Sequence, residues 1–386
     1  MANSMSSVMA ARAKLVVMDV VFIFVGYFRL CRCSIMFLCK DSHFFQWLLT
    51  FYLFCATFSL RFLYLCNCKV TVKRYNDYGN WLRGRFPFRV QKVMLDAGFT
   101  CPNRDGSKGV GGCVFCDNQA FNPSFCDREK SIRQQLADGK AFFGRKYPDM
   151  KYLAYFQAFS NTYADVETLR RRYEEALAVE DVVGIVVGTR PDCVNEAVLD
   201  YLERLSRQVF VMVEYGVESV NDHTLRTIHR EHDFACSRKA IEMTAERGVL
   251  TGGHVILGLP GEDAKENLRQ AAVVGSLPLH VLKIHHLQVL RGTRLAKMYE
   301  KEPFPVYSVD SYVALLAEYI SRLPARLLLE RFVNVSPPKM VVAPGWGVKG
   351  SEFLRRLEDY MVSHGLWQGK LAGVSWEGAF SSPGRK

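Results

Sequence analysis

Residues 101–116 read Cys-Pro-Asn-Arg-Asp-Gly-Ser-Lys-Gly-Val-Gly-Gly-Cys-Val-Phe-Cys. Three cysteines, Cys101, Cys113 and Cys116, stand here at the spacing C-x11-C-x2-C. The last two are close enough in sequence to hold one metal centre. The glycines that precede them let the loop fold tightly around that centre. The stretch therefore predicts a metal-binding loop.

Two kinds of metal centre fit this spacing. A structural zinc ion needs four ligands, and Cys126 is the candidate for the fourth. An iron–sulfur cluster held by only three thiolates leaves one iron without a protein ligand, and that iron can hold a cofactor. The loop follows the first predicted strand of an α/β domain, where active sites form, and this position favours the cluster.

Downstream of this loop, predicted strands and helices alternate. The strands are Val90–Asp96, Tyr152–Ala158, Val182–Gly188, Val209–Tyr215, Gly253–Gly258 and Val281–Leu287, and the helices lie near 128–143, 165–179, 194–206, 233–247 and 263–275. Six βα units predict a parallel sheet, because each parallel crossover needs a helix. Six are too few to close an eight-stranded barrel. We therefore expect an α/β fold, a partial (β/α)6 TIM-like barrel, with its site at the carboxyl ends of the strands.

The two ends of the chain differ from this barrel, which we place at 75–300. Residues 1–70 form an apolar extension with seven basic and two acidic side chains, and its run Phe44–Leu60 is 17 residues without a charge. That length is the lower limit for crossing a bilayer. We favour a mis-assigned start over a membrane segment. Residues 301–380 predict a small C-terminal α/β extension that includes the strand-like run Leu327–Val333.

Composition sets broad limits on the class of protein. With 49% hydrophobic and 23% charged residues, the chain is not a disordered or low-complexity protein. Twelve cysteines in 386 residues are too few for a disulfide scaffold. Fifty Lys and Arg against 39 Asp and Glu give a net charge of +11, which permits an anionic partner without requiring one.

Charged side chains stand at the ends of two predicted strands. Alternation along the fourth strand places Glu214, Gly216 and Glu218 on one face. Carboxylates inside a barrel are unfavourable unless they bind a ligand or form an internal ion pair. Arg190 follows the third strand, where its planar guanidinium suits a ligand carboxylate or a salt bridge to Asp192.

The cysteine loop and four other motifs together resemble the radical S-adenosylmethionine (radical SAM) superfamily. Within it, they are similar to an uncharacterised bacterial branch, the YhcC-like family, which is related to the radical SAM domain of the Elongator catalytic subunit. The resemblance covers roughly Tyr75 to Pro344 and excludes residues 1–70. The further motifs are Tyr152–Phe159, Gly188–Cys193, His232–Cys236 and Val255–Glu262.

This resemblance implies a radical SAM enzyme. Cys101, Cys113 and Cys116 would bind a [4Fe-4S] cluster whose open iron chelates S-adenosyl-L-methionine (SAM). Reductive cleavage of SAM would give a 5′-deoxyadenosyl radical that abstracts hydrogen from an unidentified substrate. An electron donor such as flavodoxin or ferredoxin is implied as a partner. A cytoplasmic setting is also implied, because exposed cluster thiolates oxidise readily.

The resemblance also implies which residues contact SAM. Family members use a Gly-Gly-Glu-like edge on the second strand to hold the methionine amino group, and this chain has Gln157–Thr162 there instead. The expected contacts all lie near strand ends: Gln157, Ser160 or Asn161 for the amino group, Glu218 with Glu214 for the ribose, Gly258, Leu259, Pro260 and Gly261 for the adenine, and Arg190 and Arg230 for a carboxylate of SAM or substrate.

The substrate and several roles stay open. The Elongator relationship makes RNA, and tRNA in particular, one alternative substrate, although the chain has no aromatic-basic strip of the RNA-binding kind. A zinc-stabilised nucleic-acid-binding module without catalysis is the non-enzyme alternative. Cys193 and Cys236 begin predicted helices, where a thiolate is favoured. Strand alternation predicts that only one of His285 and His286 faces the site.

Overall fold

The computed structural model describes residues 73–117, 122–144, 149–334 and 336–380. The expected apolar extension at 1–70, with its alternative as a membrane segment, lies outside these ranges. All of these described residues belong to one compact unit. Within the described ranges, no helix has the length and apolar character that a bilayer span requires.

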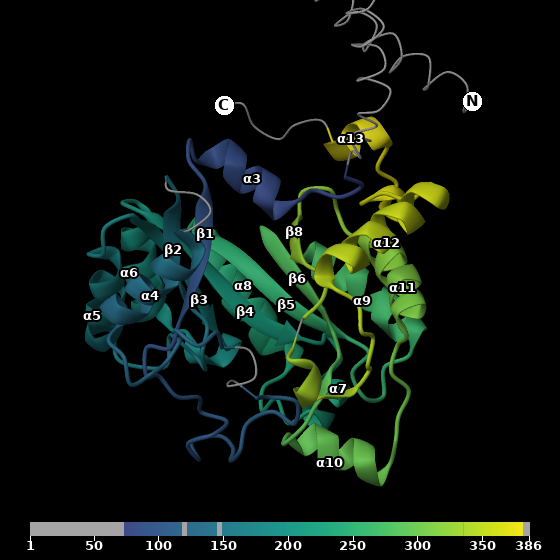
Figure 1. Ribbon diagram of the computed structural model, residues 1–386, viewed down its shortest axis with the longest axis horizontal. Helices are drawn as coiled ribbons and strands as arrows, with labels where there is room; N and C mark the ends of the chain where they lie inside the picture. Colours follow the sequence, from purple (N-terminus) through teal and green to yellow (C-terminus); the bar gives the residue numbers. More distant parts are fainter. Residues whose placement is uncertain (1–72, 118–121, 145–148, 335, 381–386) are drawn as a thin grey trace, which may run out of the picture. The chain divides into compact units, whose positions relative to one another are not determined.

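A seven-stranded parallel sheet forms the centre of the molecule (Figure 1). The strands, in their spatial order, are β1 (Val90–Leu95), β2 (Lys151–Phe156), β3 (Val182–Thr189), β4 (Phe210–Glu218), β5 (Leu250–Leu257), β6 (Val281–His286) and β8 (Leu328–Arg331). Every neighbouring pair is parallel. The sheet curls into a half-barrel, which confirms the predicted α/β partial barrel.

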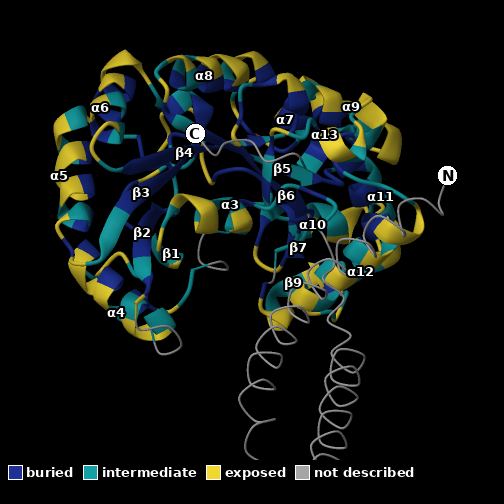
Figure 2. Ribbon diagram, turned by 90° about the horizontal axis from the view of Figure 1, so that it is seen from above, coloured by how far each residue is buried: buried dark blue, intermediate teal, exposed yellow. Residues whose placement is uncertain are grey.

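Helices connect the strands and cover the outer face of the sheet (Figure 2). They are α4 (Ile132–Gly144), α5 (Val166–Leu177), α6 (Glu196–Ser206), α8 (Phe234–Glu246) and α9 (Ala264–Ser276). Asp165, Asn195, Asp233 and Asp263 each accept a hydrogen bond from a backbone N–H of the first turn, which stabilises four of these helix starts. Each apolar helix face is buried against the strands.

The seventh strand corrects one expectation. The run Leu327–Val333 was expected to belong to a C-terminal extension that packs on a six-stranded barrel, but β8 pairs with β6 and so adds a seventh strand to the sheet. Its pairing brings residues from the C-terminal quarter of the chain to the barrel interior. The helices α11 (Val309–Arg322) and α12 (Gly350–Ser363) pack against each other, and α11 also packs against α9.

Shorter elements complete the described structure. A 3-10 turn at Pro338–Met340 falls on the Pro-rich pair Pro337–Pro338, where a turn was expected. The sequence patterns did not predict α3 (Tyr78–Arg85), α7 (Asp222–Thr227), α10 (Arg294–Lys301), α13 (Trp376–Phe380), the antiparallel pair β7 (Val289–Leu290) and β9 (Val341–Ala343), or the 3-10 turns Pro191–Cys193 and Lys370–Ala372. These elements are short, so they carry few periods of a hydrophobic pattern.

A buried ionic network joins four strands inside the half-barrel. Glu214 on β4 is 1% exposed and accepts hydrogen bonds from Lys92 on β1 at 2.8 Å and Lys283 on β6 at 2.5 Å. Lys92 also bonds Glu330 on β8 at 2.8 Å. Burial alone would raise the pKa of Glu214, but Lys283 and Lys92 outweigh it and hold that pKa well below 4.5.

Replacing Glu214 tests this network. Glu214→Gln leaves two lysines without their shared carboxylate, so we expect the free energy of unfolding at pH 7 to fall by about 3–5 kcal/mol. Because the folded-state pKa of Glu214 is depressed, its contribution is present above the unfolded value of 4.5 and is lost as the pH falls below it. Urea unfolding at pH 7 and pH 4 should therefore give a smaller difference at pH 4.

Glu167→Gln is the matched control. Glu167 is exposed on α5 and pairs with Arg170 at 2.7 Å. Solvent screens such a pair, so its loss should change stability little. Equal destabilisation by both variants would contradict a special role for the buried network.

Candidate cofactor site in the half-barrel

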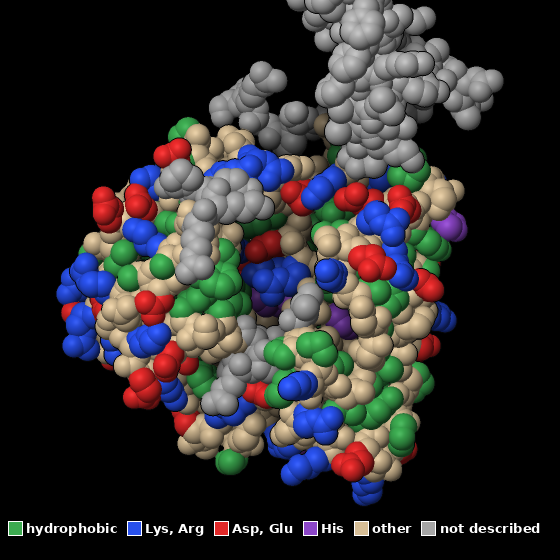
Figure 3. Space-filling view, in the orientation of Figure 1, with side chains coloured by type: hydrophobic (Ala, Val, Ile, Leu, Met, Phe, Trp, Pro, Cys, Tyr) green, Lys and Arg blue, Asp and Glu red, His purple; other side chains and the backbone are tan. Residues whose placement is uncertain are grey.

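A cavity of about 750 Å³ opens at the carboxyl ends of the strands. Figure 3 shows this face hollowed, with acidic, basic and histidine side chains inside the hollow. The walls include Cys113 and Cys116 from the loop after β1, Gln157 after β2 and Arg190 after β3. The cavity therefore lies where the βα pattern places a site.

The cysteine loop is fixed by main-chain hydrogen bonds. The Arg104 N–H donates to Cys101 O at 2.8 Å, and the Gly112 N–H donates to Asn103 O at 2.7 Å. A side chain at Gly109 would collide with the Asn103 amide, so glycine is required there. These contacts close the loop on itself and keep its first and last cysteines in the same region.

Cationic and amide groups surround the cysteines. Arg230 Nη1 and Asn103 Nδ2 each donate to Cys113 Sγ at 3.5 Å. Burial, and next the neighbouring Cys113, raises the pKa of Cys116 to about 11. Without a metal, the Cys116 thiol therefore stays protonated at neutral pH. A bound metal ion would replace the proton and stabilise the thiolate in this buried position.

The donor set fits a three-cysteine cluster better than a closed zinc site. Cys126 packs in the hydrophobic core, and its pKa rises to about 12 through burial and the charges of Asp96 and Asp127, with no contribution from the other cysteines. Among the residues that the structure describes, no three His, Cys, Asp or Glu side chains converge on a single ion. In a cluster each thiolate binds a different iron, so its ligands need not converge on one point.

Several residues that are expected to contact SAM have buried polar atoms without partners. Within the described ranges, Gln157 Oε1, Ser160 Oγ, Asn161 Oδ1, Arg190 Nη1 and Arg230 Nε are buried and make no hydrogen bond. Such atoms are rare in folded proteins and indicate a missing partner. Gln157, Arg190 and Arg230 line the cavity. The set contains acceptors for an ammonium and donors for a carboxylate, which fits the amino-acid part of SAM.

Backbone strain occurs on the cavity wall. Phe159 and Glu218 have φ values of 64° and 65°, a left-handed conformation that side-chain-bearing residues seldom adopt. Both line the cavity. Glu218 ends β4 next to a register shift and lies 3.7 Å from Arg230 Nη2. Strain of this kind gathers at functional sites, where it aims side chains.

Three groups of residues that were expected to contact SAM differ in how far they are free to do so. Glu214 lines the cavity but is committed to the ionic network. Arg190 forms a two-point salt bridge with Asp192, at 2.8 and 2.9 Å, and keeps one guanidinium nitrogen unused. The turn Gly258–Gly261 follows β5 with φ of 87° at both glycines, but it does not line the cavity.

The cysteines at the two helix starts behave as protonated thiols rather than as thiolates. Burial raises the pKa of Cys193 to about 12 and also raises that of Cys236. The two histidines at the end of β6 make different contacts, as strand alternation predicted. The His285 ring lies beside His254 and Asn334 in the cavity, whereas the His286 ring stacks on Trp346 with 4.0 Å between the ring centroids.

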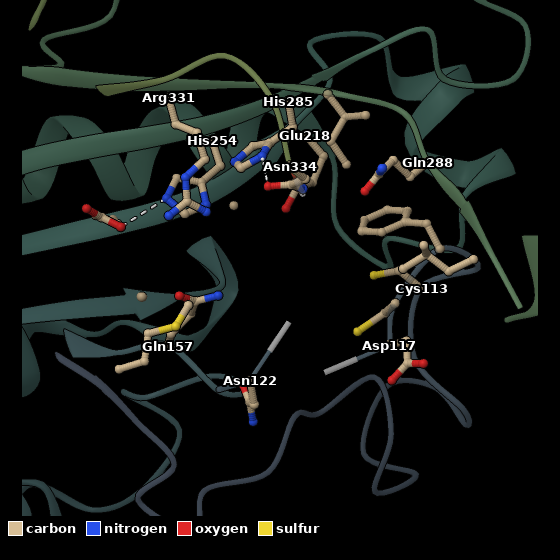
Figure 4. Close-up of a pocket in the computed structure, with 18 of the residues that line it drawn as sticks. Cys113, Asp117, Asn122, Gln157, Glu218, His254, His285, Gln288, Arg331 and Asn334 are labelled. Atoms are coloured by element: carbon tan, nitrogen blue, oxygen red, sulfur yellow. Dashed lines mark hydrogen bonds and ion pairs between the residues drawn. The ribbon is translucent and has the colours of Figure 1, made fainter. Parts of the chain in front are cut away.

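Sequence reasoning missed the far end of the cavity. Figure 4 shows Cys113 and Asp117 at one end and His254 and Arg331 at the other. Asn334 and His285 lie between them and share a 2.8 Å hydrogen bond. The sequence did predict a strand-like run at Leu327–Val333, which contains Arg331. The pairing of that strand with β6 is a long-range contact that local patterns do not reveal.

The fold and site agree with the family comparisons. A family model described as the radical SAM superfamily matches residues 101–270, and a radical SAM C-terminal domain model matches 279–363. The chain belongs to the radical SAM superfamily and is an enzyme of that type. The family implies a [4Fe-4S] cluster and SAM as cofactors, and the thiols and unpartnered polar atoms described above suit both.

Two similar bacterial proteins match this chain over nearly their whole length. The uncharacterized protein YtqA of Bacillus subtilis is 38% identical over 301 residues, which are 78% of this chain and 94% of YtqA. Protein YhcC of Escherichia coli is 35% identical over 79% of this chain and 97% of YhcC. The solved structure of Elp3 from Methanocaldococcus infernus shares the fold, with a TM-score of 0.56 and 17% identity over 73% of this chain and 64% of that one.

Cysteine replacements should separate cluster ligands from core thiols. We expect Cys101→Ala to reduce the iron and acid-labile sulfide of anaerobically reconstituted protein to near zero. Cys126→Ala is the matched control and should retain both, because Cys126 lies in the core away from the loop. Loss of metal in Cys126→Ala, or zinc in place of iron in the wild type, would contradict the three-cysteine assignment.

Proposed function

We propose that the chain holds a [4Fe-4S] cluster on Cys101, Cys113 and Cys116 and cleaves SAM reductively. The observation that supports this most is the position of the cysteine loop, which faces a cavity whose other walls carry unpartnered buried polar atoms. When bound, the cluster supplies the electron that splits SAM into methionine and a 5′-deoxyadenosyl radical, which abstracts hydrogen from the substrate.

The chain's own side chains would bind and orient SAM. Gln157 Oε1 can accept from the ammonium group, and Arg190 Nη1 can donate to the carboxylate. Glu218 can accept from the ribose hydroxyls, since its carboxylate faces the cavity from the end of β4. Phe115, Phe143 and Phe159 supply apolar wall that would limit the access of water to a reactive radical.

We also propose that a small redox protein such as a flavodoxin or ferredoxin delivers the electron. The tip of the cysteine loop supports this, because most of residues 105–111 are exposed while Cys113 beside them is buried. A partner that docks on this tip would approach the cluster without entering the cavity.

The direct test is product formation under anaerobic conditions. The reconstituted full chain, given SAM and dithionite, should produce 5′-deoxyadenosine and methionine in equal amounts. Cys113→Ala should produce neither. Wild-type protein that carries a cluster but leaves SAM intact would contradict the proposal.

A second variant tests the assignment of Glu218. Glu218→Gln removes the charge that strengthens the ribose hydrogen bonds, so the SAM concentration for half-maximal cleavage should rise about tenfold. The iron content should stay unchanged, because Glu218 is not one of the residues proposed to bind the cluster. An unchanged SAM requirement would remove Glu218 from the binding site.

The substrate class needs its own comparison. Deuterium transfer into 5′-deoxyadenosine, measured with a deuterated small-metabolite pool and with a deuterated tRNA pool, identifies the class that donates hydrogen. We expect transfer from the metabolite pool, because the far end of the cavity is formed by residues of the half-barrel strands β5, β6 and β8. Transfer from tRNA alone would favour the RNA-modifying alternative.

A further inference from the structure

The end of the cavity away from the cysteines contains a cation that no residue neutralises. Arg331 ends β8, is half-buried and lines the cavity. No hydrogen bond or ion pair joins its guanidinium to another residue in the part of the chain that the structure describes. Its nitrogens are not among the fully buried ones, so they can reach a ligand in the cavity.

The other charges of the cavity are already balanced. Arg190 pairs with Asp192, and Arg230 lies beside Glu218 and Cys113. The two carboxylates of the buried ionic network are also occupied. Glu214 binds Lys92, Lys283 and His254, and Glu330 binds Lys92 at 2.8 Å and lies 3.8 Å from Lys283.

The neighbours of Arg331 that line the cavity on β5 and β6 are polar side chains, His254 and His285. Burial, followed by the charges of His254 and Arg331, lowers the pKa of His285 well below 6.5, so this imidazole is neutral at pH 7. His285 Nδ1 bonds Asn334 Oδ1 at 2.8 Å, which leaves the Asn334 amide nitrogen as a donor. The rings of His254 and His285 lie 5.6 Å apart between their centroids. Together these residues make a polar pocket in which the Asn334 amide nitrogen and the Arg331 guanidinium can donate to a ligand.

We propose that Arg331 and the amide nitrogen of Asn334 donate to an oxyanion group, a carboxylate or a phosphate, of a small organic substrate, in a part of the cavity that His254 and His285 also line. The guanidinium presents two parallel N–H groups, the geometry that matches either oxyanion. The inference rests on the proposed function, since it assigns the opposite end of the same cavity to the substrate. It places the bound anion across the cavity from the cysteine loop (Figure 4).

The depth of Arg331 favours a small molecule over a nucleic acid. The residue sits on a strand of the half-barrel, and its neighbours in the cavity wall come from β5 and β6. A phosphodiester within a polymer would meet a cation at the rim, where the chain can pass by. An anion on a free terminus can instead enter the half-barrel.

Calorimetric titration of the full chain with two probes, inorganic phosphate and malonate, tests the site before and after cluster reconstitution. We expect wild-type protein to bind at least one probe. Arg331→Gln should weaken that binding about 10- to 100-fold, as expected when a charge-assisted hydrogen bond is lost. Arg331→Lys keeps the charge without the two-point geometry, so its affinity for the probe should lie between those of wild type and Arg331→Gln. This second variant keeps the test decisive if Arg331→Gln does not fold.

Arg355→Gln is the control, because Arg355 is an exposed arginine on α12 that pairs with Asp359 at 3.1 Å. It should bind the probes as wild type does. Preference for phosphate or for malonate assigns the anion. Absence of binding by wild type, or equal binding by Arg331→Gln and wild type, would overturn the proposal.

Two further readouts separate this proposal from others. The titrations contain no SAM, so a wild-type protein that binds the anion but fails to cleave SAM would contradict the proposed function alone. Competition with unfractionated tRNA tests the nature of the ligand. Displacement of the probe by tRNA at matched phosphate concentration would contradict a small substrate.

Discussion

Arg230 ties the cysteine loop to the end of the central strand, and the arrangement of the site depends on this contact. Its guanidinium donates to Cys113 Sγ at 3.5 Å and to Gly216 O at 2.6 Å, and it lies 3.7 Å from Glu218. The side chain is 6% exposed, so these partners must compensate for its desolvation. One buried cation thereby sets the position of the loop that carries the thiols relative to the residues expected to hold SAM.

The half-barrel gives the two ends of the cavity different properties. Near the cysteines, strained backbone at Phe159 and Glu218 and unpartnered polar atoms leave places for a ligand. Beneath the far end, Glu214 and Lys283 hold the strands together through a buried ionic contact. Such contacts fix geometry more than they add stability. This rigid base leaves Arg331 as a charge directed at the cavity rather than at the protein.

The features that depend on local sequence patterns, the strands, the helices and the cysteine loop, could be predicted from the sequence. The six βα units match the observed strands within a few residues, because buried strands and amphipathic helices repeat at distinct periods. The cysteine loop was also evident from its spacing. The role of β8 and of Arg331 was not, since pairing with β6 joins residues about fifty positions apart. The raised pKa of Cys193 likewise depends on tertiary burial, which helix position alone does not reveal.

We propose that three cysteines, with no fourth protein ligand, leave one iron of the cluster open to SAM. Electron paramagnetic resonance of the dithionite-reduced, reconstituted full chain tests it most directly. We predict the signal of a reduced [4Fe-4S] cluster and a change in that signal when SAM is added. A protein that contains zinc and gives no cluster signal, or a cluster signal that saturating SAM leaves unchanged, would contradict the account.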